Sequence, residues 1–465
     1  MKKFILIYTL LLSAFFVQGQ AYRTGLVFDD DKYDNAPVKA TLTRGLYVES
    51  VPPSNSLKPY CPSPMNQGDF GTCVGWSSNW AARTIIEAMK NGWTDPAVIN
   101  ENAYSPGFIY QMIKDKNDQN CSYGASIFDA LNYMKYNGSV KYEDFRPQCA
   151  PNVEATLQDK AMRHKIKDFA RLFGREQSAQ MKIETVKKSL SENYPVVFGM
   201  KCAPSFYDAK EVWEPTEDHN QKFGGHAMCV IGYDDNKYGG AFEIMNSWGE
   251  DWGNKGFIWI KYKDFGNFTK YAYEIFSEPA RKTVPVVAEV PKEDFSGKVK
   301  FITDKGKTME GELMGQYYKM IKKYASGTSF RIYLSNNEPA YVYALGTDNT
   351  EEIFQLFPYE PKVSAYLNYK QNDVALPSED HYITMDNTVG KDYLCVLYSK
   401  DPLDIESIKA SLAGTSGKFI SRLKTVLGNK LVSPENVQFT SEEMSFKAFS
   451  KGGAVVALIV ETDHI

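Results

Sequence analysis

The sequence is poor in the features that mark nucleic-acid-binding and metal-binding proteins. Its formal net charge is −4 and it has no run of lysine and arginine, so it lacks the cationic surface that neutralises phosphates. Among its five histidines, only His219 and His226 are close in sequence, and neither lies in a Cys-x-x-Cys or His-x-x-x-His pattern. The others, His164, His381 and His464, have no partner spacing. We therefore expect no nucleic-acid partner, no metal site and no cofactor.

Long apolar runs are also rare. Two lysines precede a single apolar run, Phe4–Val17, and small residues follow around Gly19. This run is shorter than the roughly 20 residues that span a bilayer, so residues 1–19 are typical of a secretory signal. No cysteine follows the run to accept a lipid. We expect an exported protein (periplasmic, outer-surface or secreted) with no transmembrane segment, whose mature chain begins at Gln20 or Ala21.

Three short segments contain the residue types that acyl transfer through a thioester requires. They are Gln67–Trp76, Gly224–Ala227 and Asn246–Gly249. The first supplies Cys73, a thiol nucleophile, and the second supplies His226, an imidazole acid and base. Asn246 is an amide that could orient the imidazole, and Gln67 is one that could polarise a carbonyl group.

The surroundings of Cys73 favour a reactive thiol. Residues Cys73–Met89 carry apolar side chains at helical spacing, and Asn91-Gly92 is a plausible stop. Cys73 would then begin a helix, whose unpaired N–H groups favour a thiolate over a thiol of ordinary pKa, about 8.5. An imidazolium at His226 would stabilise the thiolate further.

His226 follows Cys73 by 153 residues and Asn246 follows it by 173, slightly beyond the guide spacing of roughly 130–150 residues in papain-like enzymes. With the stretch Trp248–Gly256, this order of motifs makes residues 57–277 resemble a papain-family cysteine peptidase. The resemblance implies an α+β fold of two lobes, one helical and one β-rich. Cys73 would lie on one lobe, His226 and Asn246 on the other, with the cleft between them.

The resemblance also implies roles for single residues. Cys73 would be the nucleophile, His226 the acid and base, and Asn246 the residue that orients His226. Gln67 would donate its amide to the oxyanion, and Trp248 would cover the hydrogen bond between His226 and Asn246. These positions predict a peptidase that forms a Cys73 thioester.

Further positions match those that contact an extended substrate. Gly124 matches a glycine whose backbone pairs with the substrate, and Tyr123 replaces the first glycine of that segment. Gly199 and Ala227 fall where the family lines the pocket for the residue two before the scissile bond. Gly225 precedes the histidine, where many members carry Asp or Asn. Two small pocket residues predict a preference for Leu, Val or Phe, unless Tyr123 leans into the pocket.

Apart from Cys73, six cysteines remain in a chain expected to enter an oxidising compartment. Phe70 stands where the family commonly has a disulfide-bonded cysteine. The resemblance instead pairs Cys121 with Cys149, around a helical stretch at 126–136. Cys61 and Cys202 could pair, whereas Cys229 and Cys395 lie in apolar strands and are expected to be buried thiols.

The pattern divides the chain into a lead segment (20–56), the papain-like domain (57–277), a linker (278–297) and a β-rich α+β domain (298–465). The lead is too short for the long helical pro-segment of many papain-like zymogens. Expected helices of the papain-like domain are 73–90, 105–116, 126–136 and 180–192; expected strands are 195–200, 227–233, 242–246 and 256–261.

The last part of the chain is predicted to contain strands and two helices. The strands are 330–334, 340–345, 353–357, 382–385, 393–399 and 454–461; the helices are 404–412 and 416–428. Gln355–Pro358 and the strand before Pro402 weakly resemble a β-rich accessory domain of unknown function attached to bacterial exported peptidases and kinases. This resemblance indicates no chemistry and no partner.

Together these features predict an exported cysteine endopeptidase that acts on a protein or peptide substrate. A peptide-binding papain-like domain without turnover is the first alternative. An adhesion or scaffold protein, in which the papain-like region only supports the last domain, is the second. All four catalytic positions are filled, which favours the enzyme.

Overall fold

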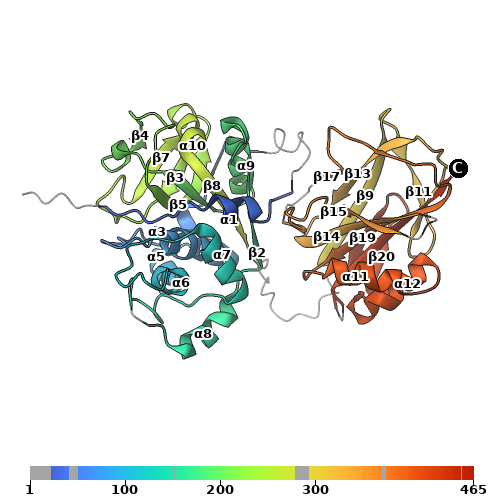
Figure 1. Cartoon of the computed structure of the whole chain (residues 1–465), viewed down its shortest axis with the longest axis horizontal. Helices are drawn as coiled ribbons and strands as arrows, with labels where there is room; N and C mark the ends of the chain where they lie inside the picture. The colour runs from blue at the N-terminus through green and yellow to red at the C-terminus, as the bar shows by residue number, and fades with distance from the viewer. Residues whose placement is uncertain are drawn as a thin grey trace, which may run out of the picture.

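The computed structural model describes residues 22–40, 51–150, 152–277, 293–348, 350, 352–368, 373–451 and 453–465. Two domains lie side by side, residues 51–277 and residues 293–465 (Figure 1). The predicted signal at 1–19 and residues 278–292 of the predicted linker lie outside the described residues. No helix within the described ranges is long and apolar enough to cross a membrane.

Helices form one lobe of the first domain (Figure 1). The segments are α3 (Cys73–Gly75), η2 (Trp76–Arg83, a π-helix), α4 (Thr84–Asn91), α5 (Pro96–Glu101), α6 (Pro106–Ile113), α7 (Ile127–Tyr136), α8 (Ala155–Ala161), η1 (Lys58–Tyr60) and η3 (Met162–His164). The first three run on as one helix, which confirms the helix predicted from Cys73. It ends where Gly92 adopts φ +68°, the left-handed conformation that glycine accepts without strain.

An eight-stranded sheet forms the other lobe, in the order β2-β8-β3-β5-β6-β7-β4, with β1 paired to β5. Its elements are β1 (Ser54–Ser56), β2 (Asp168–Arg171), β3 (Val196–Lys201), β4 (Val212–Trp213), β5 (Gly225–Asp234), β6 (Ala241–Met245), β7 (Phe257–Lys261), β8 (Thr269–Phe276), α9 (Ala179–Ser191), α10 (Tyr262–Phe268), η4 (Pro204–Phe206) and η5 (Lys237–Gly239). The four strands predicted in this lobe are confirmed. The sequence pattern did not predict β1, β2, β4 and β8, of which β2 is an edge strand of the sheet.

The second domain contains two seven-stranded sheets, β17-β13-β9-β21-β20 with β10 and β18, and β11-β12-β22-β19-β14-β15 with β16. The first sheet is built from β9 (Phe295–Thr303), β10 (Thr308–Met309), β13 (Ser329–Ser335), β17 (Val374–Leu376), β18 (Ile383–Thr384), β20 (Val437–Phe439) and β21 (Ser445–Ala448). The second is built from β11 (Gly311–Leu313), β12 (Tyr318–Met320), β14 (Ala340–Thr347), β15 (Ile353–Phe357), β16 (Tyr366–Leu367), β19 (Gly390–Ser399) and β22 (Val455–His464). The helical segments are α11 (Ile405–Ala413), α12 (Phe419–Leu427), η6 (Gly428–Lys430) and η7 (Pro434–Asn436).

Strand alternation explains how the second domain packs. Val342 and Ala344 point into the core between the two sheets, whereas Tyr341 and Tyr343 point to the opposite face. That opposite face packs against α11 and α12, and against Ala170 and Phe276 of the first domain. The predicted α+β class, with a separate β-rich domain, is confirmed. β9 begins at Phe295, inside the predicted linker.

The cysteines are as predicted. Cys121 and Cys149 form a disulfide, and Cys61, Cys202, Cys229 and Cys395 are buried free thiols. Cys61 and Cys202, for which a bond was left open, are therefore not paired with each other.

Candidate active site

Cys73 lies at the first position of the helix that faces the sheet lobe. Its side chain is buried, and backbone N–H groups of Gly25, Val74 and Ala227 act on the thiol. Gly75 lets the helix approach α6, since a Cβ at this position would lie 2.2 Å from the Pro106 carbonyl oxygen. The helix start thus places the thiol against β5 at Ala227, the residue that follows His226.

His226 and Asn246 come from adjacent strands of the sheet lobe, β5 and the end of β6. The Nε2 atom of His226 lies 2.8 Å from Oδ1 of Asn246, and both residues are buried. Because an amide oxygen only accepts, this contact assigns the proton to Nε2. The buried Nδ1 atom has no hydrogen-bond partner among the described residues. His226 thus keeps one nitrogen, Nδ1, that can accept a proton. His226 directly precedes Ala227, whose N–H acts on the Cys73 thiol.

Trp248 and Gln67 support this arrangement. The Trp248 ring stacks on the His226 ring with centroids 4.6 Å apart, at 17°. The Gln67 side chain is buried, and its Oε1 accepts a 2.6 Å hydrogen bond from the Ser247 hydroxyl. Its Nε2 donates to the Phe70 carbonyl oxygen at 2.7 Å, which uses one of two amide hydrogens. Gln67 is therefore held in place with a second hydrogen to donate.

The electrostatics of the site favour neutral groups. Burial raises the pKa of the Cys73 thiol to about 12, although the N–H groups around it act to lower that pKa. Burial also lowers the pKa of His226 to about 4, against the hydrogen bond to Asn246, which raises it. This differs from the thiolate–imidazolium pair expected from the sequence. The reason is physical, because a site closed to water disfavours both charges.

The site is closed because residues 22–28 occupy the cleft, and we call these residues the cleft segment. Leu26 N–H donates to the Gly225 carbonyl oxygen at 3.1 Å, Ala125 N–H donates to the Gly25 carbonyl oxygen at 2.9 Å, and Val27 N–H donates to the Ala125 carbonyl oxygen at 2.9 Å. The segment thereby joins the two lobes (Figure 1). The sequence did not predict this contact, because the hydrogen bonds that make it involve backbone atoms.

Trp248 also holds the start of the cleft segment. Its Nε1 donates to the Arg23 carbonyl oxygen at 2.8 Å, and the Tyr22 ring stacks on its indole at 4.9 Å. Trp248 therefore contacts both His226 and the segment that covers it.

Gly25 passes Cys73, and its backbone N–H acts to lower the pKa of the thiol. A Cβ on Gly25 would lie 2.0 Å from the Gly71 carbonyl oxygen. Only glycine fits this close approach of two backbones. The cleft segment thus passes over Cys73 with its backbone in close contact with the Gly71 backbone.

Of the predicted substrate-binding residues, Gly199, Gly225 and Trp248 contact the cleft segment. A Cβ on Gly199 would lie 2.4 Å from the Leu26 side chain, so Leu26 fills the space next to Gly199. Tyr123 is 60% exposed. The N–H of Gly124 donates to the Tyr110 hydroxyl at 3.0 Å. Ala125, which sequence analysis did not single out, makes the backbone pairs with the cleft segment instead.

Comparison with known proteins agrees with these motifs. Residues 66–276 match the profile described as papain family cysteine protease. These residues are a papain-family domain. Residues 323–402 match a separate profile, described as a domain of unknown function (DUF4384). The family supports a peptidase function for the first domain.

Several relatives are similar to the papain-family domain. An uncharacterized peptidase C1-like protein of Acanthamoeba polyphaga mimivirus is 26% identical over 44% of this chain and 66% of its own length. Testin-2 of Mus musculus is 29% identical over 32% of this chain and 43% of its own length. Pro-cathepsin H of Bos taurus is 22% identical over 54% of this chain and 75% of its own length. The chain thus spans less than two thirds of the first two relatives.

Two solved structures are also similar to part of this chain. Xylellain, a cysteine protease from Xylella fastidiosa, is 22% identical over 55% of this chain and 96% of its own, with a TM-score of 0.43. Digestive procathepsin L2 from the larval midgut of Tenebrio molitor is 18% identical over 55% of this chain and 79% of its own, with a TM-score of 0.44.

Proposed function

We propose that this protein is an exported cysteine endopeptidase whose active site is closed by its own cleft segment. The observation that carries the proposal is the state of His226, whose Nε2 is bonded to Asn246 while Nδ1 is buried without a partner. An unpartnered buried nitrogen is costly, so such atoms in native proteins call for an explanation. The explanation proposed is that Nδ1 exchanges a proton with Cys73.

The chemistry follows once a peptide replaces the cleft segment. Nδ1 of His226 takes the proton of the Cys73 thiol, and the thiolate attacks the carbonyl carbon of the substrate. The Cys73 N–H and the second hydrogen of Gln67 Nε2 then stabilise the negative oxygen. His226 returns the proton to the departing amine, which leaves a thioester at Cys73. Water, deprotonated by His226, hydrolyses the thioester to a carboxylic acid and the free thiol.

The substrate of this proposal is an extended peptide with an aliphatic side chain beside Gly199. Leu26 occupies that space and is 6% exposed. Burying a side chain of this size completely stabilises binding by roughly 1.5–3 kcal/mol. A glycine or aspartate at the same substrate position would lose that contribution.

The test compares a catalytic and a structural cysteine in the full chain after limited proteolysis of the cleft segment. Cys73→Ala should abolish peptide hydrolysis and labelling by a thiol-reactive peptide inhibitor, with the melting temperature little changed. Cys61→Ala, at another buried thiol, should retain both activities. Full hydrolysis by Cys73→Ala would refute the peptidase mechanism. Peptide binding without hydrolysis by the wild type would favour the peptide-binding alternative.

A further inference from the structure

We infer that the residues before Cys73 have two separate roles: the cleft segment (22–28) must leave for activity, whereas residues 29–40 stay as a permanent connection between the two domains. We call residues 29–40 the bridging segment. The inference rests on the proposed function for its first half only. Its second half concerns the folded protein and does not require catalysis.

The two segments differ in how deeply they are held. In the cleft segment, Leu26 is the only buried side chain, and Val27 is 44% exposed. In the bridging segment, Tyr33 and Ala36 are fully buried in the core of the papain-family domain. Ala40 is 1% exposed and belongs to the core between the sheets of the second domain. The bridging segment therefore contributes to both cores.

Tyr33 of α1 (Asp30–Asn35) is the deepest of these contacts. Its ring stacks on Tyr271 at 4.3 Å. Its hydroxyl donates to the Phe173 carbonyl oxygen at 2.8 Å and lies 3.3 Å from the Ala272 N–H. Removal of this ring would leave a cavity and take the Tyr33 hydroxyl away from the Ala272 N–H of β8, while the Phe173 carbonyl oxygen would keep the hydrogen bond from Arg171.

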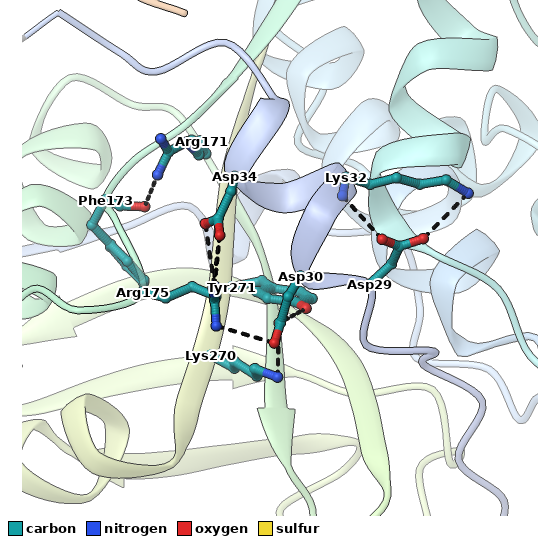
Figure 2. Close-up of polar contacts among 9 residues, drawn as sticks. All are labelled: Asp29, Asp30, Lys32, Asp34, Arg171, Phe173, Arg175, Lys270 and Tyr271. Atoms are coloured by element: carbon teal, nitrogen blue, oxygen red, sulfur yellow. Dashed lines mark hydrogen bonds and ion pairs between the residues drawn. The ribbon is translucent and has the colours of Figure 1, made fainter.

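Charged residues of α1 bind both lobes of the papain-family domain, and Figure 2 shows most of them. Arg175 lies 2.7 Å from Asp34 and 3.0 Å from Asp30, and Lys270 lies 2.8 Å from Asp30. On the helical lobe, Lys32 lies 2.8 Å from Asp129 of α7.

These contacts lower the pKa values of Asp30 and Asp34. Hydrogen bonding and the charge of Arg175 hold the pKa of Asp34 below its ordinary value. Burial acts to raise the pKa of Asp30, yet Lys270, Tyr271 and Arg175 hold it below its ordinary value as well. Both carboxylates are therefore charged at neutral pH, and their ion pairs hold α1 against the papain-family domain.

The end of the bridging segment lies between the two domains. Lys39 N–H donates to the Arg171 carbonyl oxygen at 2.9 Å, and Arg171 N–H donates to that of Pro37 at 2.7 Å. On the other side, Val38 N–H donates to the Lys362 carbonyl oxygen at 2.6 Å, and Ser364 N–H donates to that of Val38 at 2.8 Å. Val38 thus pairs with the edge strand β2 on one side and is hydrogen-bonded to the second domain on the other.

A buried ion pair completes the connection. Lys39 Nζ lies 2.7 Å from Glu274 of β8, and their side chains are 5% and 0% exposed. Asn368 of the second domain donates to the other oxygen of Glu274. If the bridging segment were removed, Glu274 would remain as a buried charge without its cation, which proteins tolerate poorly. Excision of residues 29–40 would therefore damage the enzyme, whereas loss of residues 22–28 would open it.

The experiment maps the amino terminus of the active species. The full chain is treated with a trace of protease, and samples are taken as activity and Cys73 labelling rise. We expect the intact mass and terminal sequencing to show active species that begin before Tyr33. Fully active protein that begins after Ala40, with an unchanged melting temperature, would overturn the inference and leave the proposed function standing.

A second measurement does not depend on activity. Tyr33→Ala in the full chain should lower the melting temperature by roughly 10 °C. The matched control Tyr136→Ala, at a tyrosine that is 58% exposed, should change it little. An unaffected melting temperature in Tyr33→Ala would overturn the permanent role of the bridging segment. Absence of labelling and hydrolysis after the cleft segment is gone would instead overturn the proposed function, and with it the role of residues 22–28.

Discussion

Gly25→Ala should open the active site without a change in any catalytic group. The new Cβ would lie 2.0 Å from the oxygen, 2.3 Å from the carbon and 2.5 Å from the Cα of Gly71. These are backbone atoms that cannot rotate away, and ordinary contacts of a Cβ begin near 3.4 Å. The cleft segment must therefore move by more than an ångström next to Cys73.

Such a movement breaks hydrogen bonds that hold the segment. The three bonds of Gly25, Leu26 and Val27 with Ala125 and Gly225 measure 2.9–3.1 Å, so each exceeds bonding distance after a shift of that size. If two are lost at a net of about 1 kcal/mol each, the closed state is weakened by about 2 kcal/mol, or roughly 30-fold in its population.

The assay is the rate at which a small alkylating reagent modifies Cys73, followed by peptide mapping so that other cysteines are counted separately. Gly25→Ala should be modified roughly 30-fold faster than the wild type. Gly174→Ala is the matched control, because a Cβ there meets nothing closer than the Arg171 side chain at 3.6 Å. Equal rates for Gly25→Ala and the wild type would refute the claim that residues 22–28 restrict access to the thiol.

Three further predictions follow from the site and the bridging segment. Asn246→Ala should reduce kcat by about 10²-fold and leave KM nearly unchanged, because orientation of His226 is used in the transition state; steady-state kinetics of the opened enzyme would test it, and an effect confined to KM would contradict it. Burial in the closed state lowers the pKa of His226 to about 4. The closed state is therefore fully favoured above the ordinary histidine pKa near 6.5, and this stabilisation is lost as pH falls from 6.5 towards 4. Hydrogen exchange at Leu26 and Val27, corrected for its intrinsic pH dependence, should accelerate over that range, and His226→Gln should remove the acceleration. Lys39→Met should lower the free energy of unfolding by about 3–5 kcal/mol, because it leaves the buried Glu274 carboxylate without its cation. The double variant Lys39→Met/Glu274→Leu should recover part of that loss. Denaturant titration would measure both free energies, and no recovery in the double variant would point to packing instead.

The closed state connects the pKa values to access. Burial raises the pKa of the Cys73 thiol and lowers that of His226, and the cleft segment is part of what buries them. When it leaves, solvent reduces the penalty on both charges, and the N–H groups of Val74 and Ala227 at the thiol act in favour of the thiolate. Removal of residues 22–28 would thus expose the Cys73 thiol and, at the same time, favour its ionisation.

The sequence by itself determined the elements that have a local pattern. Apolar residues at helical spacing after Cys73 predict a helix with one buried face. Nearly continuous apolar runs along β5 and β14 predict strands, and the structure buries both faces of these strands. Residue type and order selected Gln67, Cys73, His226 and Asn246 as candidate site residues. Cys121 and Cys149 were paired from the resemblance. Each of these signals depends on the side chain itself.

Only the tertiary structure decided what fills the cleft and what joins the domains. The cleft segment is held by backbone bonds of Gly25, Leu26 and Val27, and backbone groups are the same in every residue except proline. Lys39 and Glu274 meet across 235 residues of sequence, and nothing near either one predicts the other. For the same reason Ala125 could not be distinguished from Gly124. Contacts made by the main chain, or by residues far apart in sequence, leave no local pattern to read.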